Sequence, residues 1–230
     1  MPGATTPVLT QALLARIREL NLDYLDLMLA EQATGDEGGQ LQHLPARVRA
    51  ALAMLPPSAR SALAAMPYTL YSLGFEDDTF WRFACDPGAL LAPMSVRERY
   101  APARATALHS SFCELALLYA WHVATSHRLA SRVIYAMPEG TARRLAAVPL
   151  SLLKRIAVNH PGLLMPRWPT NPGFWPDLVR FAASNDESRL ATAKVLGNQL
   201  IAAELELASG VAGAIRSPRL RARKLQFHKV

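Results

Sequence analysis

One segment constrains the fold more than any other. Residues 103–137 contain neither glycine nor proline, and from Phe112 to Val123 the sequence is apolar on nearly every side of a helix. A helix of that kind has to be covered on most sides by other parts of the chain. Alanine and leucine dominate the sequence and strand formers are few. We therefore expect an all-α, compact multi-helix domain around this central apolar helix, which runs as one helix or as two joined near Ser126–His127.

Further helices are expected on both sides of the central one. Residues 8–32 carry apolar side chains at three- and four-residue steps, as in an amphipathic helix. The segment 160–176 is a proline-rich connector. We expect a single domain over residues 1–215 and a basic C-terminal tail over 216–230. The remaining helices are expected at 44–55, 56–66, 77–85, 138–148, 149–159 and, as closing helices, 177–209.

Two stretches of the chain resemble each other. The sequence reads LAAMPYTLYSLGF at residues 63–75 and LAAVPLSLLKRIA at 145–157. When Leu63 is aligned with Leu145, Pro67 falls on Pro149 and Pro56 falls on Pro138. Two prolines spaced alike around a short helix are harder to obtain by chance than shared alanine and leucine.

Each of these stretches follows a long amphipathic helix, which favours repeat units at 8–85 and 103–160. Two copies are too few for a solenoid, so we expect a pseudo-symmetric domain. On this hypothesis residues 56–74 superpose on 138–156 about a rough two-fold axis, and only the second stretch exposes positive charge near its end. The alternative is coincidence in a chain rich in alanine and leucine.

The second copy has the rhythm of a helix-turn-helix, with its turn near residues 147–149. In a DNA reader, arginine and asparagine on the second helix suit base edges and lysine suits phosphates. A plain helical hairpin has the same spacing, so both interpretations stay open. In either case the side chains expected to point outward and contact nucleic acid or a partner are Ser151, Lys154, Arg155 and Asn159.

Two segments resemble the FlhD family, whose members are subunits of the bacterial flagellar master transcription regulator. In residues 13–32 the family pattern NLxYLxL is matched by Asn21, Leu22, Tyr24, Leu25 and Leu27. Residues 129–168 resemble the rest of an FlhD chain, with matches at Ala142, Leu145, Leu150, Leu153 and Ala157. Because FlhD works as a dimer, the resemblance implies two FlhD-like units in tandem. It also implies an all-α regulator that pairs with a DNA-binding partner.

The positive charge is concentrated at the C-terminal end. The net charge is +7, but residues 216–229 hold six lysines and arginines and no acidic residue. Such a tail suits nucleic acid, an acidic partner or anionic lipid, and a solvated C-terminus has the same composition. The tail residues expected to contact nucleic acid or a partner are Arg216, Arg219, Arg221, Arg223 and Lys224.

No arrangement of residues predicts an active site. The histidines are dispersed, and the sequence has no G-x-S-x-G, P-loop or G-x-G-x-x-G pattern. The cysteines, Cys85 and Cys113, are too few for a four-cysteine zinc site and are expected as buried, reduced thiols. We therefore expect no enzyme activity, no small-molecule substrate, no metal and no cofactor. The sequence pattern of a signal peptide or a membrane span is not found, which favours a cytoplasmic protein.

Tryptophan recurs in two similar contexts, TFW at residues 79–81 and GFW at 173–175. Aromatic residues beside arginine are favoured at protein interfaces, and they are also common anchors of a core. Trp81, Trp168 and Trp175 are therefore candidate interface aromatics.

The leading functional hypothesis is a non-enzymatic, FlhD-like regulator or adaptor that acts by contact with a protein, either another regulator subunit or a second copy. Its basic tail would contact nucleic acid or an acidic partner. One alternative is a transcription factor that binds DNA directly through the hairpin at 138–159. Another is an accessory protein of a bacterial secretion or flagellar apparatus.

Overall fold

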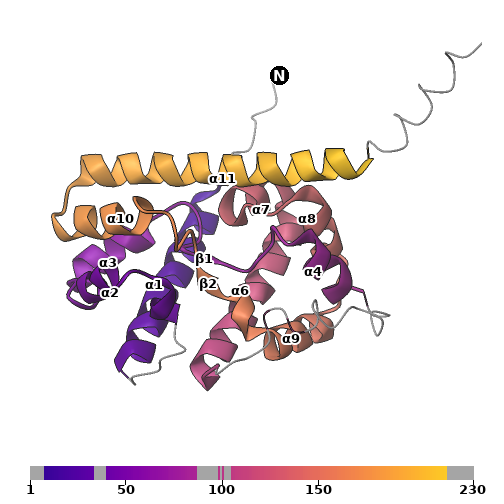
Figure 1. Cartoon of the computed structure of the whole chain (residues 1–230), viewed down its shortest axis with the longest axis horizontal. Helices are drawn as coiled ribbons and strands as arrows, with labels where there is room; N and C mark the ends of the chain where they lie inside the picture. Colours follow the sequence, from indigo (N-terminus) through magenta and orange to yellow (C-terminus); the bar gives the residue numbers. More distant parts are fainter. Residues whose placement is uncertain (1–7, 34–39, 87–97, 99, 101–104, 217–230) are drawn as a thin grey trace, which may run out of the picture.

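The computed structural model describes residues 8–33, 40–86, 98, 100 and 105–216, in which helices surround one two-stranded sheet, so the fold is all-α as expected (Figure 1). Its first elements are α1 (Gln11–Ala33), η1 (Gln40–His43), α2 (Ala46–Ala53), α3 (Pro57–Ala64), β1 (Tyr71–Ser72) and α4 (Asp78–Ala84). The next are α6 (Ala107–Ser126), α7 (Arg128–Tyr135), α8 (Glu139–Ala146) and α9 (Leu150–Asn159). The last are η3 (Pro161–Leu163), β2 (Met165–Pro166), α10 (Phe174–Ala183) and α11 (Glu187–Arg216).

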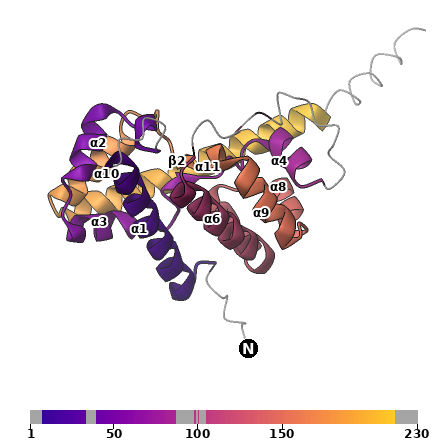
Figure 2. The same ribbon diagram turned by 90° about the horizontal axis from the view of Figure 1, so that it is seen from below.

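The apolar central segment forms two helices, α6 and α7. The break falls at His127, which has φ −140° and ψ 63°. α6 packs against α1, α7, α8 and α9, and Figure 2 shows it between α1 and α9. Its coverage is incomplete, since Leu108 and Leu115 are 63% and 46% exposed. The helix is therefore central without being fully enclosed.

Two short helices of the first unit recur in the second unit when Leu63 is aligned with Leu145. α2 corresponds to α7 and α3 corresponds to α8, with equal lengths and equivalent ends. α3 and α8 each follow an extended proline, Pro56 or Pro138. Each ends in a turn in which the amide of Met66 or Val148 donates to the carbonyl three residues earlier, at 3.3 and 3.1 Å. The predicted correspondence therefore includes the backbone of these turns.

The correspondence stops at the proline after each turn. Beyond Pro149 the chain forms α9, whereas beyond Pro67 it enters the core, where Tyr68 is fully buried. The predicted superposition of 56–74 on 138–156 is therefore wrong beyond these prolines. The reason is the hydrophobic pattern, because α9 has one apolar face and the sequence after Pro67 is apolar at nearly every position.

The two units match again at the two-stranded sheet, which the second unit reaches only after α9 and η3. β1 and β2 pair antiparallel, with Tyr71 opposite Pro166 and Ser72 opposite Met165. When the two strands are aligned with each other, Tyr71 corresponds to Met165 and Ser72 to Pro166. Tyr71 therefore pairs with Pro166, which corresponds to Ser72, and Ser72 pairs with Met165, which corresponds to Tyr71. A two-fold axis between the two strands produces this pairing.

The segment after each strand also recurs. Gly74 and Trp168 are both left-handed, with φ of 63° and 49°. The side chains of Asp77 and Asn171 then accept a hydrogen bond from the amide three residues later, at 3.0 and 2.9 Å. In both cases that amide belongs to a Phe-Trp pair. α10 therefore belongs to the second unit, which extends past the predicted boundary at residue 160, and α11 alone closes the fold.

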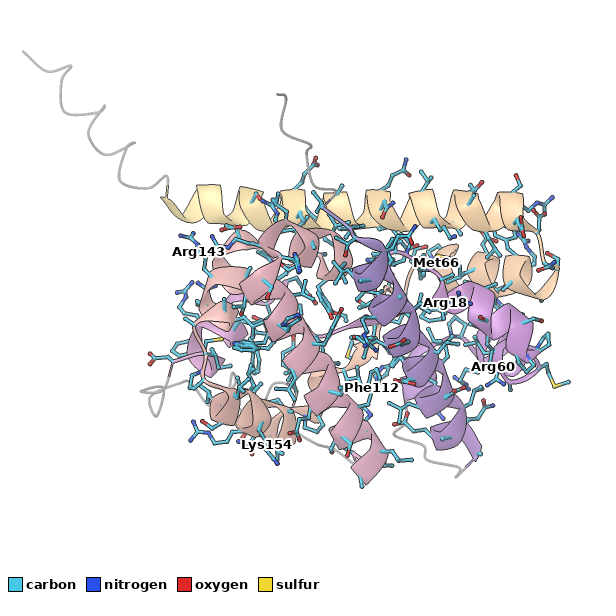
Figure 3. The ribbon with its side chains drawn as sticks, turned by 180° about the vertical axis from the view of Figure 1, so that it is seen from behind. Arg18, Arg60, Met66, Phe112, Arg143 and Lys154 are labelled. Atoms are coloured by element: carbon cyan, nitrogen blue, oxygen red, sulfur yellow. The ribbon has the colours of Figure 1, made fainter. Side chains whose placement is uncertain are left out.

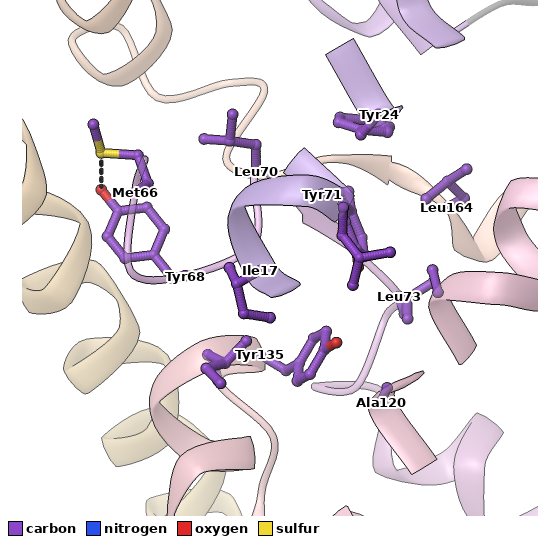
Figure 4. Close-up of a cluster of buried hydrophobic side chains, with 14 of the residues drawn as sticks. Ile17, Tyr24, Met66, Tyr68, Leu70, Tyr71, Leu73, Ala120, Tyr135 and Leu164 are labelled. Atoms are coloured by element: carbon purple, nitrogen blue, oxygen red, sulfur yellow. Dashed lines mark hydrogen bonds between the residues drawn. The ribbon is translucent and has the colours of Figure 1, made fainter. Parts of the chain in front are cut away.

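Each unit places its Phe-Trp helix on the other unit. α4 of the first unit packs on α8 of the second, and α10 of the second packs on α3 of the first. The core is shared in the same way, because Tyr24 and Tyr71 of the first unit cluster with Tyr135 and Leu164 of the second (Figure 4). The two units therefore form one domain in which α4 and α10 are exchanged, because each of these helices packs on the unit to which it does not belong.

α11 lies along one side of both units and packs on α10 and α7 (Figure 1). Its Glu204 accepts hydrogen bonds from the buried Arg167 guanidinium at 3.2 Å and from the indole of Trp168 at 2.6 Å. Arg167 also donates to the carbonyl of Ile134 at 2.8 Å. This network fixes α11 to the segment after β2.

Candidate interaction surface

The surface predicted to contact a partner lies on α9. Pro149, with ψ 146°, separates this helix from α8, because proline has no amide with which to continue a helix. The buried side of α9, which packs on α6, consists of Leu152, Leu153, Ile156 and Ala157. This amphipathic pattern turns the remaining residues of the helix toward solvent.

All four predicted contact residues on α9 are exposed, as expected, namely Ser151, Lys154, Arg155 and Asn159. Leu150 and Val158 are also exposed, at 51% and 56%. Helical periodicity gives no sign that these two are exposed, because it places apolar residues in the core. We call the six residues together the α9 face: Leu150, Ser151, Lys154, Arg155, Val158 and Asn159.

Both ends of α9 are hydrogen-bonded to α6. Before the helix, the indole of Trp121 donates to the carbonyl of Val148 at 3.1 Å. After it, Nε2 of the buried His109 lies 2.9 Å from the carbonyl of Pro161. His109 Nδ1 lies 3.0 Å from a carboxylate oxygen of Glu31 on α1, so the ring links α1, α6 and the segment after α9. These contacts hold α9 as a firm support for its exposed face.

The charge on the α9 face is only partly balanced. The Lys154 ammonium lies 3.9 Å from a carboxylate oxygen of Glu114 on α6. Arg155 is exposed and has no ion pair with any residue that the structure describes. The face therefore offers one unpaired guanidinium beside two exposed apolar side chains.

The arginines of the neighbouring α8 are engaged inside the molecule. Arg143 lies 3.7 Å from Glu139, and Arg144 forms an ion pair with Asp78 of α4. Burial acts to raise the pKa of Asp78, but hydrogen bonds and charges from Arg82 and Arg144 outweigh it and hold that pKa below its ordinary value. Arg144 thus joins the two units, whereas Arg143 pairs within α8 itself.

The candidate interface tryptophans are core residues in two of three cases. Trp81 and Trp175 are fully buried, and their indoles donate to the carbonyls of Gly74 at 2.8 Å and Arg167 at 2.6 Å. The prediction is wrong for these two, because the exchanged helices turn them into the shared core. Trp168 is half-buried, and the Arg167 guanidinium covers its ring at 4.6 Å.

The basic tail falls largely outside the described residues. Arg216 is the last residue of α11, and its side chain is not among the described ones. The other predicted tail contacts, Arg219, Arg221, Arg223 and Lys224, also lie outside the described residues.

The part of the chain that the structure describes contains no group of three or more histidine, cysteine or acidic side chains able to hold a metal. Burial raises the pKa of both Cys85 and Cys113 to about 12, so both are neutral thiols at physiological pH. Among the described helices, none has the length and apolar character needed to span a membrane.

The position of α9 sets the two units apart. It is an added helix between two segments that otherwise correspond, and it carries four of the nine residues predicted to contact nucleic acid or a partner. In comparisons with known proteins, no family model, curated protein or solved structure matches this chain.

Proposed function

We propose that this chain is a non-enzymatic, cytoplasmic regulator or adaptor, FlhD-like in organisation, that acts by binding a protein partner through the α9 face. The basic tail adds contact with nucleic acid or with an acidic surface of the partner. The observation that carries the proposal is the additional exposed helix in one of two otherwise corresponding units.

The composition of the α9 face suits a protein partner. It combines two half-exposed aliphatic residues, Leu150 and Val158, with the unpaired Arg155. Apolar side chains with arginine are typical of interface centres, and a surface held rigid before binding loses less entropy on association. The hydrogen bonds at both ends of α9 supply that rigidity.

The first test is capture of a partner from a lysate of the native host with the purified full chain as bait. The Lys154→Glu/Arg155→Glu variant reverses charge on the α9 face, and Arg16→Glu/Arg180→Glu reverses two exposed charges elsewhere. We expect one partner to be captured by wild type and control, and about tenfold less by the α9 variant. Equal capture by all three chains, or no capture by any, would contradict the proposal.

A second candidate function is direct binding of DNA by the hairpin of α8 and α9. The exposure of Ser151, Arg155 and Asn159 on the second helix of the hairpin favours it. The exposed Leu150 and Val158 on the same face favour a protein partner over phosphates.

A salt titration on random and genomic DNA separates the two functions. For the regulator we expect only non-specific binding that falls steeply with salt and disappears when the chain is cut after Gly213. A sequence preference that survives this cut and is lost in Arg155→Ala would instead establish the hairpin as the DNA reader.

A further inference from the structure

An open groove of about 430 Å³ lies on the first unit, between α1, the end of α3 and α11. Figure 3 shows two of its residues, Arg18 and Met66, well away from Lys154 of the α9 face. Its volume falls within the range of ligand-binding sites, about 300–1,000 Å³. The lining residues on which its chemistry depends are Leu14, Arg18, Met66, Pro67 and Lys194.

The floor of the groove is apolar and firmly supported. Met66 is only 1% exposed, and Leu14 and Pro67 are half-buried beside it. Beneath it, the Tyr68 hydroxyl lies 3.6 Å from the Met66 sulfur (Figure 4). The same hydroxyl donates to the carbonyl of Ala193 on α11 at 3.1 Å. Met66 therefore packs the floor from within, and the accessible apolar surface of the groove belongs to Leu14, Ala15 and Pro67.

The groove is positively charged and contains no acidic lining residue. Arg18 and Lys194 lie on its rim, and neither forms an ion pair with a described residue. Arg18 donates to the Ser61 hydroxyl, which orients the guanidinium without cancelling its charge. Other arginines on nearby helices are neutralised, since Arg16 pairs with Glu19 at 2.7 Å, Arg60 with Asp26 at 2.8 Å and Arg189 with Asp186 at 3.2 Å.

The repeat explains why this place is open. Ala65 to Pro67 of the groove correspond to Ala147 to Pro149, from which the second unit continues as α9 along its long helix α6. The first unit has no such helix, and its long helix α1 is left accessible beside the same turn. The α9 helix of a second copy is a poor occupant, because its Lys154 and Arg155 would meet like charges.

We propose that this groove binds an acidic amphipathic helical segment of a partner protein. Apolar side chains of that segment lie on Leu14, Ala15 and Pro67, and its carboxylates pair with Arg18 and Lys194. The site is separate from the α9 face, so either can fail without the other.

The test is selection from a phage-displayed library of random peptides, each long enough for three helical turns, against the full chain. We expect enrichment of sequences that combine leucine, phenylalanine or methionine with glutamate or aspartate at helical spacing. The selected peptides, measured by fluorescence anisotropy, should bind Arg18→Glu/Lys194→Glu at least about tenfold more weakly and lose affinity as salt rises.

A second variant blocks the space without changing the charge. Ala15 is exposed and lines the groove, so Ala15→Trp should also abolish peptide binding while leaving the unfolding midpoint unchanged. Arg16→Glu/Arg189→Glu, on the same two helices, and Lys154→Glu/Arg155→Glu should bind as wild type does. No enrichment, enrichment of peptides without acidic residues, or equal binding to the groove variants would each overturn the proposal. Binding of phosphatidylserine vesicles, but of no peptide, would assign the groove to a membrane surface instead.

Discussion

In the first unit, the chain that leaves α3 at Pro67 runs directly into the core and forms β1. In the second unit, the chain that leaves α8 at Pro149 first builds the surface helix α9 and then η3 before it reaches the equivalent strand, β2. The turns before the two prolines have the same hydrogen bonds. The pattern of side chains after the turn, and not the turn itself, therefore decides whether the chain goes inward or forms a helix.

The two units also hold this part of the chain with different side chains. In the first unit the buried Asn21 amide donates to the carbonyls of Ala64 and Tyr68, at 3.2 and 2.9 Å, and accepts from the amide of Leu70 at 2.9 Å. In the second unit one indole bond from Trp121 fixes the same turn. Asn21 thus has a definite role in the fold, since it joins α1 to the segment after α3.

The largest expected effect tests the equivalence of the two units. Trp81→Ala and Trp175→Ala each remove a fully buried indole from an exchanged helix. Each should lower the free energy of unfolding by about 3–5 kcal/mol, as deletions of large core side chains do. Urea denaturation at neutral pH measures both. A large effect at one position and a negligible effect at the other would show that the units are not equivalent.

The second comparison concerns Asn21 and Trp121. Asn21→Leu leaves the buried carbonyl of Tyr68 and the amide of Leu70 without partners, so we expect a loss of about 2–4 kcal/mol in unfolding free energy. Trp121→Phe leaves one carbonyl unpaired and should cost only about 1–2 kcal/mol. The same denaturation experiment compares them. Equal losses would mean that the two turns are held equally strongly despite their different contacts.

The third prediction addresses α11, which has no counterpart in the repeat. A Cβ on Gly197 would clash with the Tyr68 hydroxyl, so Gly197→Ala should cost about 1–3 kcal/mol through overpacking. Gly210 on the same helix has nothing within 4 Å, and Gly210→Ala should stabilise by up to about 1 kcal/mol. Thermal unfolding followed by circular dichroism distinguishes the signs. Two stabilising substitutions would place Tyr68 away from α11.

The smallest effect concerns charge between the units. The contact of α4 with α8 contains the Asp78–Arg144 ion pair, whereas the described residues show no ion pair between α10 and α3. Because the pKa of Asp78 is depressed, its contribution to stability is full above the ordinary carboxyl pKa and is lost as pH falls through the folded value.

The contribution is small because Asp78 is half-exposed and the pair is screened by water, so we expect less than about 1 kcal/mol. At neutral pH the unfolding free energy of wild type should exceed that of Asp78→Asn by this margin, and the margin should disappear as the pH falls from about 5 to 2. Urea midpoints across this range measure the difference. A margin that stays constant with pH would exclude the pair as its source.

Local pattern was enough to predict much of the candidate site. The helical periodicity of residues 149–159, with a proline at its start, places Lys154 and Arg155 on the outer side of an amphipathic helix. Periodicity did not single out Leu150 and Val158 as exposed, and the recurrence of TFW and GFW made Trp81 and Trp175 candidates for an interface. These errors have one cause, because burial depends on which distant helix arrives at a position, and periodicity contains no such information.

By itself, the sequence determined the all-α class, the prolines that separate the helices, the turn shared by the two units and the polar outer side of α9, because each depends on residues close together in the chain. Tertiary structure alone decided the exchange of α4 and α10, the burial of their tryptophans and the groove that unites Arg18, Met66 and Lys194. These features depend on contacts between residues far apart in sequence, which form only when the whole core packs.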